Sequence, residues 1–213
     1  MQKIYCIGGL AADKRLFARL VVPGHELVFL PWLPFDKADT MRTYALKMAG
    51  QIPDHKAIVA GLSFGGMLSV EIAKEHHDWK IFLISSAKTS AELGYNSGFL
   101  RWLSRKEVIP APLFHIPNPV VLYKLGVHTK EQLALLCDII RNSNTSLVRW
   151  SINTLLTWNN SDYPRNIIHI HGTNDRVIRS ANVRPDHWIE GGSHIMIYDR
   201  GAEVGKIISS HLP

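Results

Sequence analysis

The chain has 213 residues, of which 46% are hydrophobic, and its formal net charge is +6 at pH 7. This length and composition favour one domain with a sizeable core over two domains. No apolar run approaches the roughly 20 residues needed to cross a bilayer. Basic residues between Lys88 and Asn160 are scattered, which favours a solvated face over a nucleic-acid surface or the steering of anionic substrates.

Six short apolar runs are predicted to be strands, at residues 4–7, 27–30, 57–60, 81–84, 167–170 and 187–190. Most of them are continuous, which is typical of parallel strands covered on both faces. Helical patterns lie between them at residues 14–20, 40–51, 64–76 and 202–211. This alternation predicts a doubly wound, mainly parallel six-stranded sheet. Asp13 is interpreted as the N-cap of the first helix rather than as a catalytic carboxylate.

The segment from about residue 88 to 160 departs from this alternation. Prolines interrupt it at positions 110, 112, 117 and 119, and helical patterns occupy residues 98–106, 119–125, 129–142 and 146–156. Thr129 and Gln132 have the spacing of a capping box, in which each side chain binds the other residue's backbone N–H. The segment is therefore predicted to be a helical insertion.

Residues 61–65 read Gly-Leu-Ser-Phe-Gly, directly after the third predicted strand and at the start of a predicted helix. The pattern G-x-S-x-G at a strand-to-helix turn is typical of a nucleophile elbow, where the serine is exposed on a strained turn. Side chains at Gly61 and Gly65 would clash where strand and helix approach each other. A plain tight turn is the alternative.

Partners for a nucleophilic serine follow in the order acid, then histidine. Asp175 lies in the loop after the fifth predicted strand, and His194 follows a glycine-rich loop after the last strand and precedes the last helix. A serine hydroxyl needs a base to activate it, and the base needs an orienting acid. Asp175 could instead cap a turn, and His169 and His171 are interpreted as strand residues.

With these three motifs, the chain resembles the α/β-hydrolase superfamily over about residues 3–212. The resemblance implies that Ser63 is the nucleophile, His194 the general base and Asp175 the acid that orients it. It also implies a strand order of 2-1-3-4-5-6, with the site at the carboxyl ends of the strands. The oxyanion hole would use the N–H groups of Phe64 and of Leu10. Many members have His-Gly where this chain has Gly8-Gly9.

In this superfamily, an insertion at residues 88–160 would form a cap over the active site of a single domain spanning residues 1–213. Aromatic residues in the insertion and after the second strand are predicted to line a substrate pocket: Trp102, Trp150, Trp158, Trp32 and Phe35. They could equally form the core of the cap.

The resemblance implies a serine hydrolase of the carboxylesterase or thioesterase kind, acting on a small-molecule acyl substrate through an acyl-enzyme. A ligand-binding or partner-binding protein without hydrolytic activity, or a C–C bond hydrolase, is the alternative. We expect no cofactor and no metal, because Gly8-Gly9 is too short for a dinucleotide fingerprint and Cys6 and Cys137 have no metal-ligand spacing. The two cysteines form no disulfide framework, and the first residues lack a signal peptide's apolar region, so the chain is predicted to be cytoplasmic.

Overall fold

A computed structural model of the chain describes residues 1–94 and 115–212. Its strands are β1 (Gln2–Ile7), β2 (His25–Phe29), β3 (Ile58–Leu62), β4 (Lys80–Ile84), β5 (Ile167–Gly172) and β6 (His187–Ile189). They form one parallel sheet in the order β2-β1-β3-β4-β5-β6. The predicted sheet and strand order are thus confirmed. The predicted helix at 98–106, which contains Trp102, lies outside the described residues.

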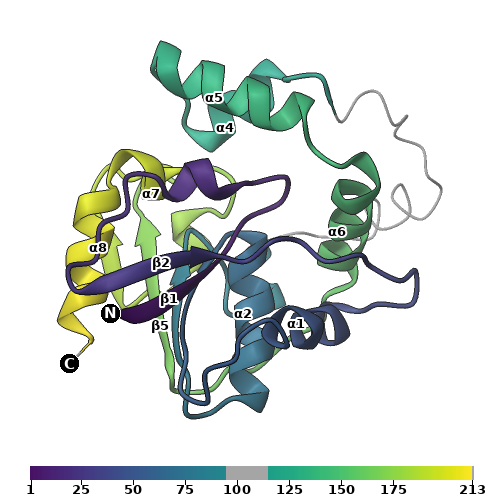
Figure 1. Cartoon of the computed structure of the whole chain (residues 1–213). Coiled ribbons are helices and arrows are strands. Elements are labelled where there is room, and N and C mark those ends of the chain that lie inside the picture. Colours follow the sequence, from purple (N-terminus) through teal and green to yellow (C-terminus); the bar gives the residue numbers. More distant parts are fainter. Residues whose placement is uncertain (95–114, 213) are drawn as a thin grey trace.

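Helices cover both faces of the sheet (Figure 1). They are α1 (Met41–Ala49), α2 (Phe64–Glu75), α7 (Met196–Asp199), α8 (Gly201–Ser210) and the 3₁₀ helix η1 (Lys14–Phe17). Alternate residues of a strand belong to different hydrophobic clusters, because successive side chains point to opposite faces. In β1, Tyr5 and Ile7 pack in the cluster that contains α1 and α2. Ile4 and Cys6 pack in the cluster that contains η1, α7 and α8.

The first predicted helix is shorter than expected. Asp13 is its N-cap, since Asp13 Oδ1 accepts a hydrogen bond from Arg15 N at 2.9 Å, but the helix ends at Phe17 rather than at residue 20. Beyond it, the backbone passes so close to α8 that a Cβ on Gly201 would lie 2.2 Å from the carbonyl oxygen of Arg19. This close packing against α8 determines the path of the backbone after Phe17, where a longer helix was predicted.

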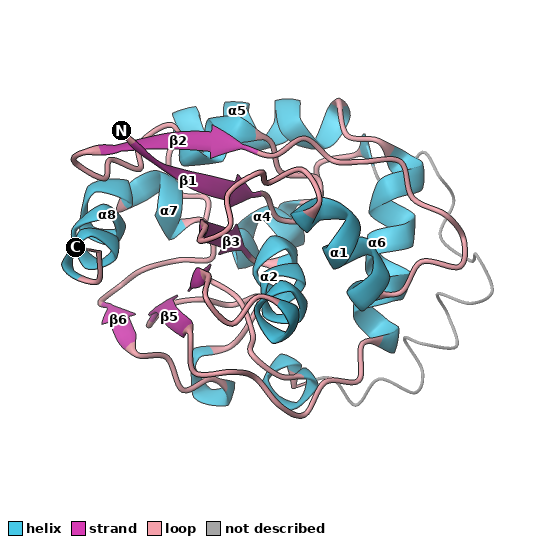
Figure 2. Cartoon of the chain, turned by 60° about the horizontal axis from the view of Figure 1, so that its bottom comes forward, coloured by secondary structure: helices cyan, strands magenta, loops and turns pink. Residues whose placement is uncertain are grey.

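In the described part of the stretch between β4 and β5, the α-helices are α4 (Pro119–Leu125), α5 (Lys130–Arg141) and α6 (Thr145–Thr157). We call them the cap helices. Helices α4 and α5 lie above the carboxyl ends of the strands, and Figure 2 shows the same arrangement from another side. The predicted capping box is present, with both reciprocal hydrogen bonds between Thr129 and Gln132. No helix in residues 1–94 or 115–212 is long and apolar enough to cross a membrane.

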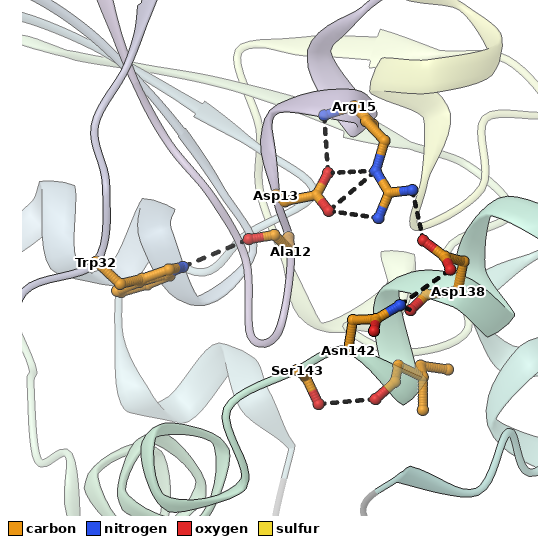
Figure 3. A network of polar contacts seen from close by, with 8 residues as sticks. Ala12, Asp13, Arg15, Trp32, Asp138, Asn142 and Ser143 are labelled. Carbon is orange, nitrogen blue, oxygen red and sulfur yellow. Dashed lines mark hydrogen bonds and ion pairs between the residues drawn. The ribbon is translucent and has the colours of Figure 1, made fainter.

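Ion pairs fasten α5 to the rest of the chain. Arg15, in η1, donates to Asp138 at 2.6 Å (Figure 3), and Arg19 donates to Glu131 at 2.7 Å. Tyr198, in α7, also donates to Glu131, at 2.6 Å. These contacts fix α5 against two segments that border the candidate site, the one after β1 and the one after His194.

Candidate active site

Ser63 occupies the sharp turn between β3 and α2. Its backbone has φ 52° and ψ −117°, a conformation that costs a residue with a side chain about 1–3 kcal/mol. A Cβ on Gly61 would lie 2.6 Å from the carbonyl oxygen of Gly65, and a Cβ on Gly65 would lie 2.3 Å from that of Gly8. Neither glycine position has room for a side chain. The geometry is that of a strained elbow and not of a plain tight turn.

The structure brings the three predicted residues together. His194 Nε2 lies 2.9 Å from Ser63 Oγ, and His194 Nδ1 lies 2.8 Å from Asp175 Oδ2. A carboxylate can only accept a hydrogen bond, so Nδ1 carries the proton and Nε2 is left as an acceptor facing the serine hydroxyl. This tautomer can remove the proton of Ser63, which is the task of a general base.

Asp175 is buried in the loop after β5 and uses its two carboxylate oxygens for different tasks. Oδ1 accepts from the backbone N–H groups of Val177 and Ile178, at 2.8 and 3.0 Å, while Oδ2 faces His194. Burial by itself raises the pKa of Asp175, but His194, His171 and the Val177 N–H outweigh it, and the pKa lies below its ordinary value. Asp175 therefore caps the turn and contacts His194 at the same time. Its side chain is a carboxylate at neutral pH.

Two backbone N–H groups near Ser63 could receive a developing oxyanion. Phe64 begins α2, and the first N–H groups of a helix have no acceptor within the helix. Leu10 lies in the loop after β1, which approaches the elbow so closely that a Cβ on Gly9 would lie 3.2 Å from Ser63 Cβ. Among the hydrogen bonds within the described part of the chain, none has the N–H of Phe64 or of Leu10 as its donor. Both N–H groups are therefore left without an acceptor among the described residues.

A cavity of about 540 Å³ opens at Ser63 and His194. Its walls come from the loop after β1 and the first turns of α2, and from all three cap helices. Leu125, Leu136 and Ile152 are examples from α4, α5 and α6. The volume lies within the range of small-molecule sites. Ser63 and His194 thus face a hollow in the molecule rather than flat surface.

Known structures superpose on nearly all of this chain. The epoxide hydrolase of Bacillus megaterium in complex with an inhibitor has a TM-score of 0.73 at 11% identity, with 100% of this chain and 93% of that chain covered. A putative lipase from Acinetobacter baumannii AYE has a TM-score of 0.70 at 17% identity, covering 99% and 83%. An N-acyl homoserine lactonase complexed with N-hexanoyl homoserine has 0.69 at 16%, covering 99% and 88%.

The chain has the α/β-hydrolase fold. No protein-family model and no curated protein sequence matches it, so this assignment comes from the structural likeness. A fold of this kind hosts many chemistries, and the function has to be argued from the site itself.

Of two buried histidines of β5, His171 lies next to Asp175 and His169 lies next to His171. His171 Nε2 donates to the carbonyl of Ile178 at 2.9 Å and lies 3.5 Å from Asp175 Oδ2. His169 Nε2 lies 3.2 Å from His171 Nδ1. Burial lowers the pKa of both rings, and the charge of His171 lowers that of His169 further. Both are strand residues, as predicted. Their i, i+2 spacing places both side chains on one face of the strand, and this spacing could have predicted the contact between the two rings.

Four of the five aromatic residues predicted to line the pocket lie elsewhere. None of the described residues that line the cavity is Trp32, Phe35, Trp150 or Trp158, and Trp102 lies outside the described residues. The Trp150 ring centroid lies 5.2 Å from that of Phe35, and both residues pack against the cluster that contains α1 and α2. The pocket prediction is thus corrected for these four residues, which pack in or against the core. The reason is that α6 packs with its tryptophan side against the core.

The described residues include no group of three or more His, Cys, Asp or Glu side chains arranged to hold a metal ion. Both cysteines are free thiols. Cys6 is buried in β1, and burial raises the pKa of its thiol to about 12. That thiol is therefore uncharged at neutral pH and acts as a small core side chain.

Proposed function

We propose that the protein is a serine hydrolase that cleaves an ester or a thioester through an acyl-enzyme intermediate. The observation that carries this proposal is the hydrogen-bonded line from Ser63 to His194 to Asp175, with its two distances of 2.9 and 2.8 Å. A protein that only binds a ligand has no need of a serine on a strained turn whose proton acceptor is fixed in the correct tautomer.

The first half of the proposed reaction acylates the serine. Ser63 Oγ attacks the acyl carbon while His194 Nε2 takes the hydroxyl proton, and the carbonyl oxygen becomes an oxyanion. The N–H groups of Phe64 and Leu10 would donate to this oxygen. The carbon–oxygen or carbon–sulfur bond to the leaving group then breaks, and His194 gives its proton to the leaving atom.

The second half returns the free enzyme. A water molecule attacks the acyl carbon, and His194 takes one of its protons. The bond to Ser63 Oγ breaks, the serine regains its proton from His194, and the carboxylic acid leaves. In both halves Asp175 stabilises the imidazolium and holds its ring in place, which is why a pKa below its ordinary value is useful at this position.

Labelling with a fluorophosphonate tests this proposal. The parent protein should be labelled at Ser63, as located by mass spectrometry of its peptides, and should hydrolyse p-nitrophenyl acetate. Ser63→Ala should lose the label and about 10⁴-fold or more of turnover. Alanine retains the Cβ that the elbow already accommodates, so the thermal midpoint should change little.

Ser69→Ala is the matched control. Ser69 lies on the same helix, and its Oγ donates to the carbonyl of Gly65 at 2.7 Å. This variant removes a buried hydroxyl near the elbow, but not the one beside His194, and it should keep both label and turnover. A parent protein that takes no label, or a Ser63→Ala protein labelled as strongly as the parent, would refute the serine-hydrolase proposal.

A further inference from the structure

The described residues that line the cavity at Ser63 are mostly aliphatic. Its described lining contains no Lys, Arg, Asp or Glu side chain. Val148, Ile152 and Leu155 recur at i, i+4 and i+7, so they form one apolar face of α6 toward the cavity. Helices α4 and α5 add aliphatic residues from the cap side. Although the formal net charge of the chain is +6, the described lining of the cavity at the candidate nucleophile carries no charged side chain of these types.

Apart from Ser63 and His194, the polar side chains in this lining are Asn118 and Ser143. Asn118 Oδ1 accepts from Val120 N at 2.8 Å and so caps α4. Ser143 Oγ donates to the carbonyl of Ile140 at 2.8 Å (Figure 3). Both groups form hydrogen bonds at helix ends. The described polar groups left to bind a ligand in the cavity are thus those of Ser63 and His194 and the backbone of the loop after β1.

Three charged side chains on elements that border the cavity pair with one another and are not among its described lining residues. Asp13 and Arg15 bind each other at 2.7 Å, and Arg15 also binds Asp138 (Figure 3). Their side chains are 40%, 41% and 53% exposed, so these charges are solvated. A charged group on a ligand that reached into the cavity would leave water without gaining an oppositely charged Lys, Arg, Asp or Glu partner among the described lining residues, which is costly.

From these walls we infer that the group transferred to Ser63 is an uncharged aliphatic acyl chain that extends into the cavity beneath the cap helices. The inference rests on the proposed function and names its substrate class. Each methylene taken from water into such a cavity gains about 0.8 kcal/mol, or about fourfold in kcat/KM. A carboxylate at the far end of the same chain would reverse this gain.

Two substrates of equal chain length separate charge from size. They are p-nitrophenyl octanoate and the mono-p-nitrophenyl ester of suberic acid, which differ in the terminal carboxylate. We expect kcat/KM for octanoate to be at least about a hundredfold higher than kcat/KM for p-nitrophenyl acetate. It should also exceed kcat/KM for the suberate monoester by at least a similar factor. Equal kcat/KM for octanoate and suberate would overturn the inference.

Ile152→Arg places a cation in the cavity wall, on the face of α6 that Val148 and Leu155 share. It should lower kcat/KM for octanoate and raise it for the suberate monoester, so that their ratio shifts by at least about a hundredfold. Asn153→Arg is the matched control, because this neighbouring residue does not line the cavity, and it should keep the parent ratio. A loss of stability alone would lower kcat/KM for both substrates by the same factor and would leave their ratio unchanged.

Fluorophosphonate labelling distinguishes failure of this inference from failure of the proposed function. If the parent protein is labelled at Ser63 and hydrolyses acetate, but does not discriminate octanoate from suberate, the serine-hydrolase proposal stands and the inference of an aliphatic acyl chain is refuted. If the parent protein takes no label, both are refuted. If Ile152→Arg fails to fold, the parent ratio still decides the inference.

Discussion

Asp175→Asn should leave the fold intact and reverse the tautomer of His194. The asparagine side chain can be placed in two ways. If its oxygen keeps the hydrogen bonds from the N–H groups of Val177 and Ile178, its NH₂ group faces His194 Nδ1. The ring must then accept at Nδ1 and carry its proton on Nε2. In that state Nε2 cannot take the proton of Ser63.

The flipped asparagine is unfavourable because its NH₂ group would face two backbone donors. Each buried N–H left without an acceptor costs about 1–3 kcal/mol, so the first placement should dominate. The same substitution in a serine protease lowers kcat about 10⁴-fold, which equals about 5.4 kcal/mol in the activation free energy. We expect a loss of this order here, since the wrong tautomer has the same cause.

The assay is turnover of a p-nitrophenyl ester, with folding followed by thermal melts and the protonated ring nitrogen of His194 identified by ¹⁵N NMR. Asp186→Asn is the matched control. Asp186 Oδ2 accepts from the backbone N–H of His169 at 2.7 Å, and an asparagine oxygen can keep this bond, so the control makes the same Asp-to-Asn change beside β5 without altering the contact to His194. A loss below about tenfold in a folded Asp175→Asn protein would show that another group orients His194.

Three further predictions follow from packing and titration. Gly65→Ala would put a Cβ 2.3 Å from a backbone oxygen of the loop after β1, so the thermal midpoint should fall by the equivalent of more than about 3 kcal/mol, whereas Gly50→Ala at a helix end should be nearly neutral. Trp150→Ala should cost about 3–5 kcal/mol of unfolding free energy in denaturant titrations. Burial lowers the pKa of His171 below its ordinary 6.5, so the unfolded state binds more protons and the parent loses stability as the pH falls through that value. His171→Gln should therefore flatten the pH dependence of urea unfolding between about pH 7 and 5.

The candidate triad could be predicted from sequence because each member is tied to a local pattern. Ser63 lies between a strand and a helix with glycines at fixed spacing, and a Cβ on either glycine would collide with backbone. Asp175 and His194 each follow a strand. Parallel strands bring their carboxyl ends to one edge of the sheet, so local order along the chain determines proximity in space.

Other features depend on how elements dock, and no local pattern reveals them. The N–H groups of Val177 and Ile178 fix one oxygen of Asp175, and any residue type supplies such groups. The early end of the first helix depends on contact with Gly201, far along the chain. In both cases the partner is a backbone group, which leaves no trace in the composition of the neighbouring sequence.

The error about the aromatic residues has the same origin and shows what decides specificity. Helix α6 is apolar on two sides: Trp150 packs against the core, while Ile152 lies on the opposite side and lines the cavity. Sequence periodicity indicates that such a helix is buried all round, but not which side meets the core. The larger aromatic side chain gives the bulk of packing area to the core, and the aliphatic side is left to the cavity. Substitutions two residues apart should therefore separate two properties, with Trp150→Ala lowering stability and Ile152→Arg changing which acyl chain is accepted.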